Sequence, residues 1–186
     1  MELNQPMAKP SKEQIHLLDE LRDFVIEVMR DMPEWVDAKV ERLRSIPLGV
    51  LRRNATQRHG VTRWKRGVNL HTLQPEDVEV IDIHPKMLNQ QWKAYSAFVL
   101  HHEYIHALGL RAHNTLFRQL EAAWPGRTAG EQGIQFTEHL RLERAIWLWC
   151  CPDCQQAFPR QKPSRGRYRC RKCNTVLLDK KNPSLA

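Results

Sequence analysis

The segment from residue 97 to residue 110 carries the residue types of a hydrolytic metal site. It reads AFVLHHEYIHALGL, in which His102, Glu103 and His106 form the pattern HExxH. On an α-helix, His102 and His106 are about 40° apart around the axis and one turn apart along it, so both imidazoles can bind one zinc ion. Glu103 is roughly 100° round from His102, which places its carboxylate near a water molecule on that ion. The pattern predicts a zinc-dependent peptidase with Glu103 as its catalytic base.

A third ligand is needed, because catalytic zinc is usually held by three side chains and a water. His113 follows His106 by seven residues, and Gly109 lies between them where the chain can leave the helix and fold back. We therefore predict that His113 is the third ligand. A carboxylate from a later helix, Glu138 or Glu143, is the alternative, as in another class of HExxH enzymes.

A metzincin site is disfavoured by the spacing. HALGLRAH resembles the metzincin pattern HxxGxxH, but its last histidine stands one residue too far along the chain. Metzincins also need a methionine turn beneath the metal, and no methionine follows Met87. The neighbouring His101 points about 140° away from His106 on a helix, so we expect a surface residue or a neighbour of the ligands instead of a ligand.

A second metal site is indicated by two CxxC pairs that are separated by fifteen residues. Each pair lets two thiolates approach one ion from a tight turn, and four thiolates complete a closed, structural zinc site. Two disulfides or four unrelated thiols are the alternative, which this spacing disfavours. Cys150 is left over, and we expect its thiol to pack beside Trp147 and Trp149 or to compete for the metal. The predicted zinc ligands are Cys151, Cys154, Cys170 and Cys173.

Positive charge is concentrated around these cysteines. The chain has a net charge of +8, and Asp179 is the only acidic residue after Asp153. Such a surface suits a polyanion, so we expect DNA to bind through this basic ribbon. Phe158 and Tyr168 lie among the cations, where they either stack on unpaired bases or fill the small core. The cations are Arg160, Lys162, Arg165, Arg167, Arg169, Arg171, Lys172, Lys180 and Lys181.

A second basic run covers residues 52–66. It contains Trp64 and no acidic residue. It either extends the DNA-binding surface of the ribbon or forms a solvated face of the protein. Its cations are Arg52, Arg53, Arg58, Arg63, Lys65 and Arg66.

The elements that position these sites follow from periodicity. Ser11 and Gln14 form a capping-box pattern ahead of apolar residues at helical spacing, which predicts a helix over 11–31. Pro33 is expected to start a second helix that ends before Pro47. Its predicted apolar stripe is Trp35, Val36, Val40 and Leu43.

Strands and further helices follow. The short β-branched segments 61–64 and 78–83 predict two or three strands. After the HExxH helix, apolar residues predict a helix that closes at Pro125 and Gly126 and packs under the zinc site, and then another over 129–146. The apolar positions of these two helices are Leu116, Phe117, Leu120 and Ala123, and then Ile134, Phe136, Leu140 and Ile146.

The domain organisation follows from these elements. A chain of 186 residues with 41% apolar content can bury one ordinary core and a small metal-held module. We predict a flexible tail over 1–10, a metallopeptidase domain over 11–146 and a zinc ribbon over 147–186. The start of the chain lacks the pattern of a signal peptide, and no segment is long enough to span a bilayer. We expect a soluble, intracellular protein, cytoplasmic or associated with the nucleoid or nucleus.

From about residue 50 to residue 180, the chain resembles the SprT-like, Spartan-type zinc metallopeptidases. The resemblance rests on the order of TQRHGVTRW, VIDIHPKML, FVLHHEYIHALGL, HNTLFRQLEAAWP, CPDC and YRCRKC. Many family members have a longer loop before the third histidine and a glycine after it, whereas here six residues intervene and Asn114 follows.

The resemblance implies a fold and an activity. The fold is α+β, with a mainly helical, zincin-like metallopeptidase core, a small β-sheet and a C-terminal β zinc ribbon. One catalytic zinc is bound by His102, His106 and His113, one structural zinc lies in the ribbon, and Glu103 is the catalytic base. The implied substrates are proteins crosslinked to DNA or tightly bound on it, which is a task of DNA repair, and nucleic acid is the implied activator.

Two alternatives remain open at this point. The chain could be a nucleic-acid-binding zinc-ribbon protein whose HExxH helix is not catalytic. It could also be a peptidase without a nucleic-acid role, in which the cations bind acidic protein partners.

Overall fold

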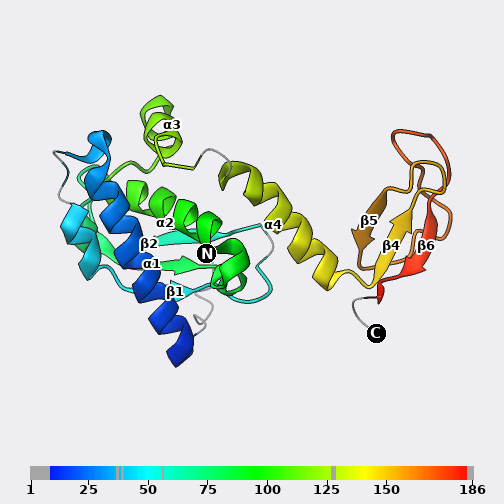
Figure 1. Cartoon of the computed structure of the whole chain (residues 1–186), viewed down its shortest axis with the longest axis horizontal. Helices are drawn as coiled ribbons and strands as arrows, with labels where there is room; N and C mark the ends of the chain where they lie inside the picture. Colours follow the sequence, from blue (N-terminus) through cyan, green and yellow to red (C-terminus); the bar gives the residue numbers. More distant parts are fainter. Residues whose placement is uncertain (1–8, 37, 39, 56, 127–128, 184–186) are drawn as a thin grey trace. The chain divides into compact units, whose positions relative to one another are not determined.

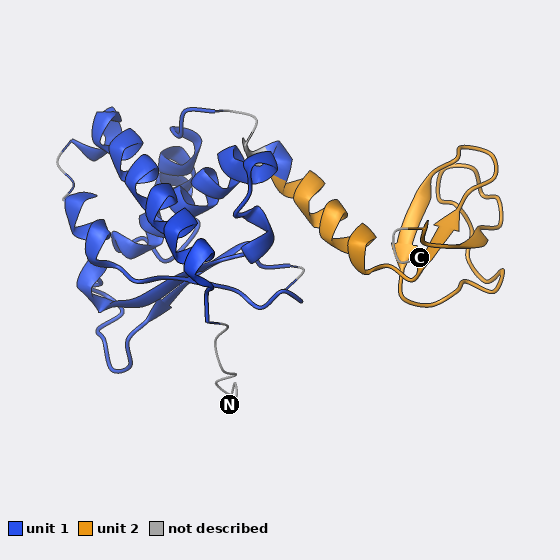
Figure 2. Cartoon of the chain, turned by 60° about the horizontal axis from the view of Figure 1, so that its bottom comes forward, with its two compact units in different colours: residues 1–132 blue, residues 133–186 orange. Residues whose placement is uncertain are grey.

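The chain divides into two units, Met1–Gln132 and Gly133–Ala186 (Figure 2). A computed structural model describes residues 9–36, 38, 40–55, 57–126 and 129–183. Helices and two small sheets confirm the predicted α+β class. The boundary predicted between residues 146 and 147 falls inside the second unit, between a helix and the ribbon. Most of the tail predicted over 1–10 lies outside the described residues.

Helix α1, Lys12–Asp31, begins and ends where the sequence predicts. Ser11 caps it through both bonds of the capping box, from Gln14 N to Ser11 Oγ at 3.2 Å and from Ser11 N to Gln14 Oε1 at 2.9 Å. One face of the helix is buried in the core of the first unit. The buried residues are Leu18, Leu21, Val25, Ile26 and Met29.

The helix predicted after Pro33 is wrong as a single element. The chain forms two short 3-10 helices instead, η1 (Pro33–Trp35) and η2 (Val40–Ser45). The predicted apolar stripe is broken because Val36 is 76% exposed, while the other three members are buried. Arg44 and Glu41 of η2 form ion pairs with residues of α1 at the surface.

The sheet of the first unit has the strand order β1-β3-β2. Strands β2 (Gly60–Trp64) and β3 (Val78–Ile83) match the predicted segments and pair antiparallel. The third strand is β1 (Leu48–Val50), which pairs parallel to β3. Central strand β3 is almost wholly buried, whereas β2 lies at an edge with all residues half-buried.

Helix α2, Lys93–Ala107, carries the HExxH pattern. It contacts α1, β2 and β3 (Figure 1), and ten of its residues are buried. Three single-turn 3-10 helices precede it, namely η3 (Pro75–Asp77), η4 (Pro85–Met87) and η5 (Gln90–Trp92). The pattern therefore lies on a helix that is held from several sides.

Helix α3, Thr115–Ala122, follows directly after His113. Asn114 caps it, because its side chain accepts a hydrogen bond from Phe117 N at 2.9 Å. Phe117 is fully buried, whereas Leu116 is 53% exposed. The predicted helix is present, and it turns one aromatic residue inward.

Helix α4, Ala129–Arg144, runs from the first unit into the second. Phe136 and Leu140 are buried, but Ile134 and Ile146 are exposed. The predicted stripe is half correct, because Ile134 precedes Phe136 by two residues and so lies about 200° round the helix.

The ribbon sheet has the order β5-β4-β6, and both pairs are antiparallel. Its strands are β4 (Trp147–Cys150), β5 (Ala157–Arg160) and β6 (Leu178–Lys181). Asn182 ties the end of the ribbon to the end of α4, since its side-chain amide donates to the carbonyls of Leu142 and Ala145 at 2.7 Å each. None of the described helices is long and apolar enough to cross a membrane.

Candidate metal centres

The three histidines predicted as ligands meet at one point. His102 and His106 lie on α2, and His113 lies in the turn before α3. The Nε2 atom of His113 is 3.3 Å from Nε2 of His102 and 3.1 Å from Nε2 of His106. Three nitrogens bound to one tetrahedral zinc ion at 2.0–2.1 Å would be roughly 3.3 Å apart. The spacing fits a single zinc ion.

Hydrogen bonds on the far side of two rings fix which nitrogens face this point. His102 Nδ1 is 2.6 Å from Glu121 Oε1, and His106 Nδ1 is 2.7 Å from the carbonyl oxygen of Leu110. A carbonyl and an ionised carboxylate only accept, so each Nδ1 carries the proton and each Nε2 presents a lone pair. His113 can donate a proton to only one of them. A bound cation satisfies all three nitrogens.

Phe117 of α3 forms the floor beneath these rings. Its ring centroid is 4.9 Å from that of His102, 4.7 Å from His106 and 4.6 Å from His113. An apolar floor restricts the rotamers of three rings that converge on one point.

A glycine turn ends α2 and leads the chain back to His113. Gly109 has φ +104°, and its N–H donates to His106 O at 2.8 Å. The same turn brings the Leu110 carbonyl to His106 Nδ1. A Cβ atom on Gly109 would also approach the Leu73 carbonyl to 3.2 Å, so glycine serves both conformation and packing here.

Glu103 is held by strand β2. Thr62 Oγ1 donates to Glu103 Oε2 at 2.8 Å. The strand approaches closely because residue 60 is glycine, since a Cβ there would lie 2.7 Å from Glu103 Oε1 and 2.7 Å from Val99 Cγ1. Burial raises the pKa of Glu103, and the nearby His102 and the bond from Thr62 oppose that shift.

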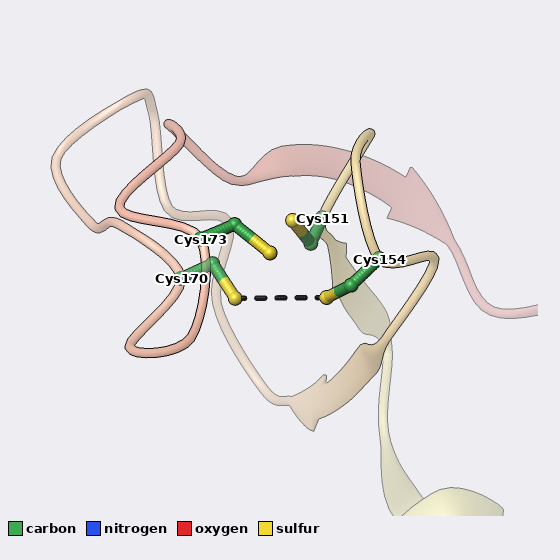
Figure 3. Close-up of side chains that lie close together, drawn as sticks. All are labelled: Cys151, Cys154, Cys170 and Cys173. Atoms are coloured by element: carbon green, nitrogen blue, oxygen red, sulfur yellow. Dashed lines mark hydrogen bonds between the residues drawn. The ribbon is translucent and has the colours of Figure 1, made fainter.

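The four predicted cysteines form a second cluster (Figure 3). Their sulfurs all lie within 4.8 Å of one another, and all four thiols are free of disulfides. The sulfurs of Cys154 and Cys170 are 3.8 Å apart, close to the roughly 3.8 Å expected for two thiolates on one zinc ion with bonds of 2.3 Å. The alternative of two disulfides is thus absent from the described residues.

The two CxxC turns have the same construction. Gln155 N donates to Cys151 O at 3.1 Å, and Asn174 N donates to Cys170 O at 2.8 Å. Gln155 and Asn174 both have positive φ, of 59° and 56°. Backbone N–H groups of Cys173 and Lys172 lower the pKa of the Cys170 thiol, whereas the neighbouring sulfurs of Cys154 and Cys151 raise the pKa of the Cys173 thiol.

Comparison with known proteins agrees with this ribbon. Residues 146–181 match the family described as the SprT-like zinc ribbon domain. The predicted SprT-like resemblance is confirmed. One curated relative, Protein SprT-like of Streptococcus equi subsp. zooepidemicus strain H70, is 28% identical over 111 residues, which cover 56% of this chain and 71% of the relative. Another, from Streptococcus equi subsp. equi strain 4047, is 25% identical over 107 residues, covering 54% and 69%. No solved structure matches the chain.

His101 is not a surface residue, so that part of the prediction is wrong. It is fully buried, with its ring 4.7 Å from the Trp124 ring and 5.9 Å from the Trp35 ring, centroid to centroid. Burial lowers its pKa to about 3, so the imidazole is neutral. The direction away from His106 was predicted, but this direction leads into the core.

Glu138 and Glu143, the alternative third ligands, lie on the part of α4 that belongs to the second unit. The group of possible metal ligands around His102 consists of three histidines among the described residues. Glu143 is 3.8 Å from His139 on the same helix, at the spacing of a helical ion pair.

Cys150, on β4, is not part of the cysteine cluster. Its sulfur lies 3.8 Å from the carbonyl oxygen of Leu148. It is half-buried next to Cys151, whose sulfur belongs to the cluster.

A cationic groove lies on the SprT-like ribbon. It encloses about 790 Å³ and includes Trp149, Tyr168 and four cations. The Trp149 and Tyr168 rings stack at 4.4 Å, and the Arg160 guanidinium lies 5.0 Å from the Trp149 ring. Tyr168 is 52% exposed, whereas Phe158 packs against the buried cysteines. Asp179 accepts bonds from Ser164 N and Arg165 N, which orders the loop beside the groove.

The basic run over 52–66 is partly used within the fold. Arg63 Nε donates to Asp82 Oδ2 at 2.7 Å, and Asp82 is only 1% exposed. Lys65 Nζ donates to the Glu76 carbonyl at 2.7 Å. These two cations are therefore bonded within the sheet and to the turn that precedes β3.

Proposed function

We propose that this chain is a zinc-dependent endopeptidase of SprT-like type that hydrolyses proteins bound or crosslinked to DNA. The observation that carries the proposal is that the Nε2 atoms of three histidines meet at one point, next to the turn of α2 that carries buried Glu103. The likeness to two proteins named SprT-like agrees with the family resemblance from which a zinc metallopeptidase was inferred. In this proposal His102, His106 and His113 hold the metal, and Glu103 is the catalytic base.

The residues would divide the work of hydrolysis. Zinc, when bound, supplies an acidified water and polarises the carbonyl of the bond to be cut. Glu103 accepts the proton of that water and later delivers it to the leaving amine. Thr62 holds the Glu103 carboxylate in one orientation through its hydroxyl. Glu121 and the Leu110 carbonyl hold two imidazoles in the tautomer that presents Nε2.

Strand β2 offers a place for the substrate backbone. Among the strands in the described part of the chain, β2 pairs only with β3, so its second edge has no strand beside it. An extended peptide can add to such an edge through main-chain hydrogen bonds. Because Thr62 of this strand contacts Glu103, a peptide held along β2 would lie near the catalytic base.

The ribbon groove supports a nucleic-acid partner. Tyr168 exposes one face of its ring, because the other face stacks on Trp149. Arg160, Lys162, Arg165 and Arg167 line the same groove. An aromatic face among cations is the arrangement that binds single-stranded nucleic acid, by stacking and by contact with phosphates. We infer that unpaired DNA binds here.

The test is cleavage of a DNA-bound basic protein, with and without single-stranded DNA, by the wild type and by Glu103→Gln. We expect the wild type to cleave and DNA to increase the rate. Glu103→Gln should lose cleavage by a factor of at least about 100, as expected for loss of a general base. Its zinc content and its DNA affinity should remain those of the wild type.

A second candidate function is supported by the ribbon alone, namely a nucleic-acid-binding protein whose HExxH helix is not catalytic. The family match covers only residues 146–181, and the cationic groove lies in that part. The same assay separates the two functions. Equal behaviour of Glu103→Gln and wild type would rule out the assigned base, and DNA binding without cleavage would favour the second function.

A further inference from the structure

We propose that Glu121 is a positioning residue for the metal site, which orients His102 through its carboxylate and is itself held by Arg118. Neither the sequence pattern nor the resemblance to the SprT-like family assigns this role. The inference rests on the proposed zinc site, and it adds a requirement beyond the three histidines and Glu103. It also makes α3 the helix that organises the site.

Both oxygens of the Glu121 carboxylate are engaged. Oε1 is 2.6 Å from His102 Nδ1, and Oε2 accepts from Arg118 Nη1 at 2.8 Å. The Glu121 side chain is only 16% exposed, whereas that of Arg118 is 58% exposed. Two short bonds, one to each oxygen, leave the carboxylate little rotational freedom. The imidazole of His102 is therefore oriented by a carboxylate that Arg118 holds in place.

The charge of Glu121 distinguishes His102 from the second histidine. His106 donates to a neutral backbone carbonyl, while His102 donates to a carboxylate. A carboxylate behind an imidazole makes the other ring nitrogen a stronger donor to a metal.

Helix α3 supports two of the three histidines. Its N-cap, Asn114, follows His113 directly, so the start of the helix sets the position of that residue. Phe117, one turn later, packs against the rings, and Glu121 lies one further turn along. Residues 114, 117 and 121 are spaced at three and four residues, which places them on one helix face.

The test compares metal binding by Glu121→Gln, Glu121→Ala and wild type. The amide oxygen of glutamine still accepts from His102 Nδ1, so Glu121→Gln keeps this bond. It removes the charge and also the bond from Arg118, because the amide nitrogen only donates. Alanine removes both the charge and the acceptor. We expect the histidine site to lose roughly 10- to 100-fold in zinc affinity, with a larger loss for Glu121→Ala than for Glu121→Gln. Arg118→Met should give a smaller loss in the same direction.

The measurement is competition for zinc with a chelator, combined with the visible spectrum of the cobalt-loaded protein. Thiolate charge-transfer bands report the cysteine site separately from the histidine site. Affinity at the cysteine site should not change in any variant. Glu20→Gln is the matched control, because Glu20 is an exposed glutamate of α1 that pairs with His16 only at 3.5 Å. At saturating zinc, kcat of Glu121→Gln should return to near the wild-type value, since the residue acts through the metal.

Wild-type zinc affinity in both Glu121→Gln and Glu121→Ala would overturn the inference. If Glu121→Ala fails to fold, the isosteric Glu121→Gln alone decides. A wild type that binds zinc at the histidine site but cleaves no protein would sink the proposed function and leave the inference standing. A histidine site that binds no zinc in the wild type would end both.

Discussion

At the residue scale, the chemistry of this chain depends on partners that are distant in sequence. His102, Glu103 and His106 are readable from their spacing, because a helix fixes the geometry of residues one turn apart. Thr62 is 41 positions from Glu103, and Glu121 is 19 from His102. No local pattern links such pairs, since the packing of separate elements brings them together. The sequence predicted that His101 points away from His106. It did not predict that Trp124 and Trp35 bury the ring there.

Thr62→Val tests whether the orientation of Glu103 matters. The substitution keeps the shape of the side chain and removes the hydroxyl that donates to Glu103 Oε2. A hydrogen bond to a charged group contributes about 1.5–3 kcal/mol, so we expect kcat/KM for protein cleavage to fall about tenfold or more. Zinc content should stay unchanged. Thr72→Val, in an exposed loop, is the control, and equal losses in the two variants would contradict the role of Thr62.

At the element scale, the main helices were predictable and the connections were not. Helix α1 follows its capping box, and β3 follows its alternating apolar residues. The region 33–47 forms two 3-10 helices, which bury Trp35, Val40 and Leu43 and leave Val36 exposed, and no local pattern predicted this break. One residue of the sequence is linked to the close approach of β2 to α2, namely Gly60 at the start of the strand. A strand glycine can mark a close approach of another segment, but it does not say which one.

Gly60→Ala tests the contact between these two elements. The added methyl would lie 2.7 Å from atoms of both Glu103 and Val99, so β2 or α2 must shift. We expect a loss of about 1–3 kcal/mol in the free energy of unfolding, together with a fall in proteolytic activity. Gly126→Ala adds a methyl into open space at φ +124° and should affect stability alone. Denaturant unfolding and cleavage rates measure both effects, and full activity of Gly60→Ala would refute the tight packing.

At the scale of the whole molecule, the ribbon that follows α4 in the second unit has very little apolar core. Its buried cluster consists of Cys151, Cys170 and Leu177, with a few half-buried side chains around it. A core of this size rarely stabilises a fold, so the four thiolates and their metal must do so. The sequence indicated this unit strongly, since the CxxC spacing alone predicts a ribbon. It could not indicate the stacking of Trp149 on Tyr168, which joins strand β4 to the loop that precedes Cys170.

Cys170→Ser should therefore unfold the ribbon without unfolding the first unit. We expect residues beyond α4 to become sensitive to limited proteolysis and single-stranded DNA binding to be lost, because the cationic groove depends on the ribbon. The histidine site should keep its zinc. Cys150→Ser is the matched control, since its sulfur lies outside the cluster, and it should behave as wild type. A protease-resistant ribbon in Cys170→Ser would show that metal is not its main support.

Under the proposed function, the open edge of β2 has a consequence for which substrates would be cut. A substrate that binds through main-chain hydrogen bonds makes few specific side-chain contacts. Sequence preference at the scissile bond should therefore be weak. Selectivity would then come from the ribbon, because a second binding module raises the local concentration of proteins that are bound to the same DNA. Under this arrangement a substrate would be selected by its location and not by its amino-acid sequence.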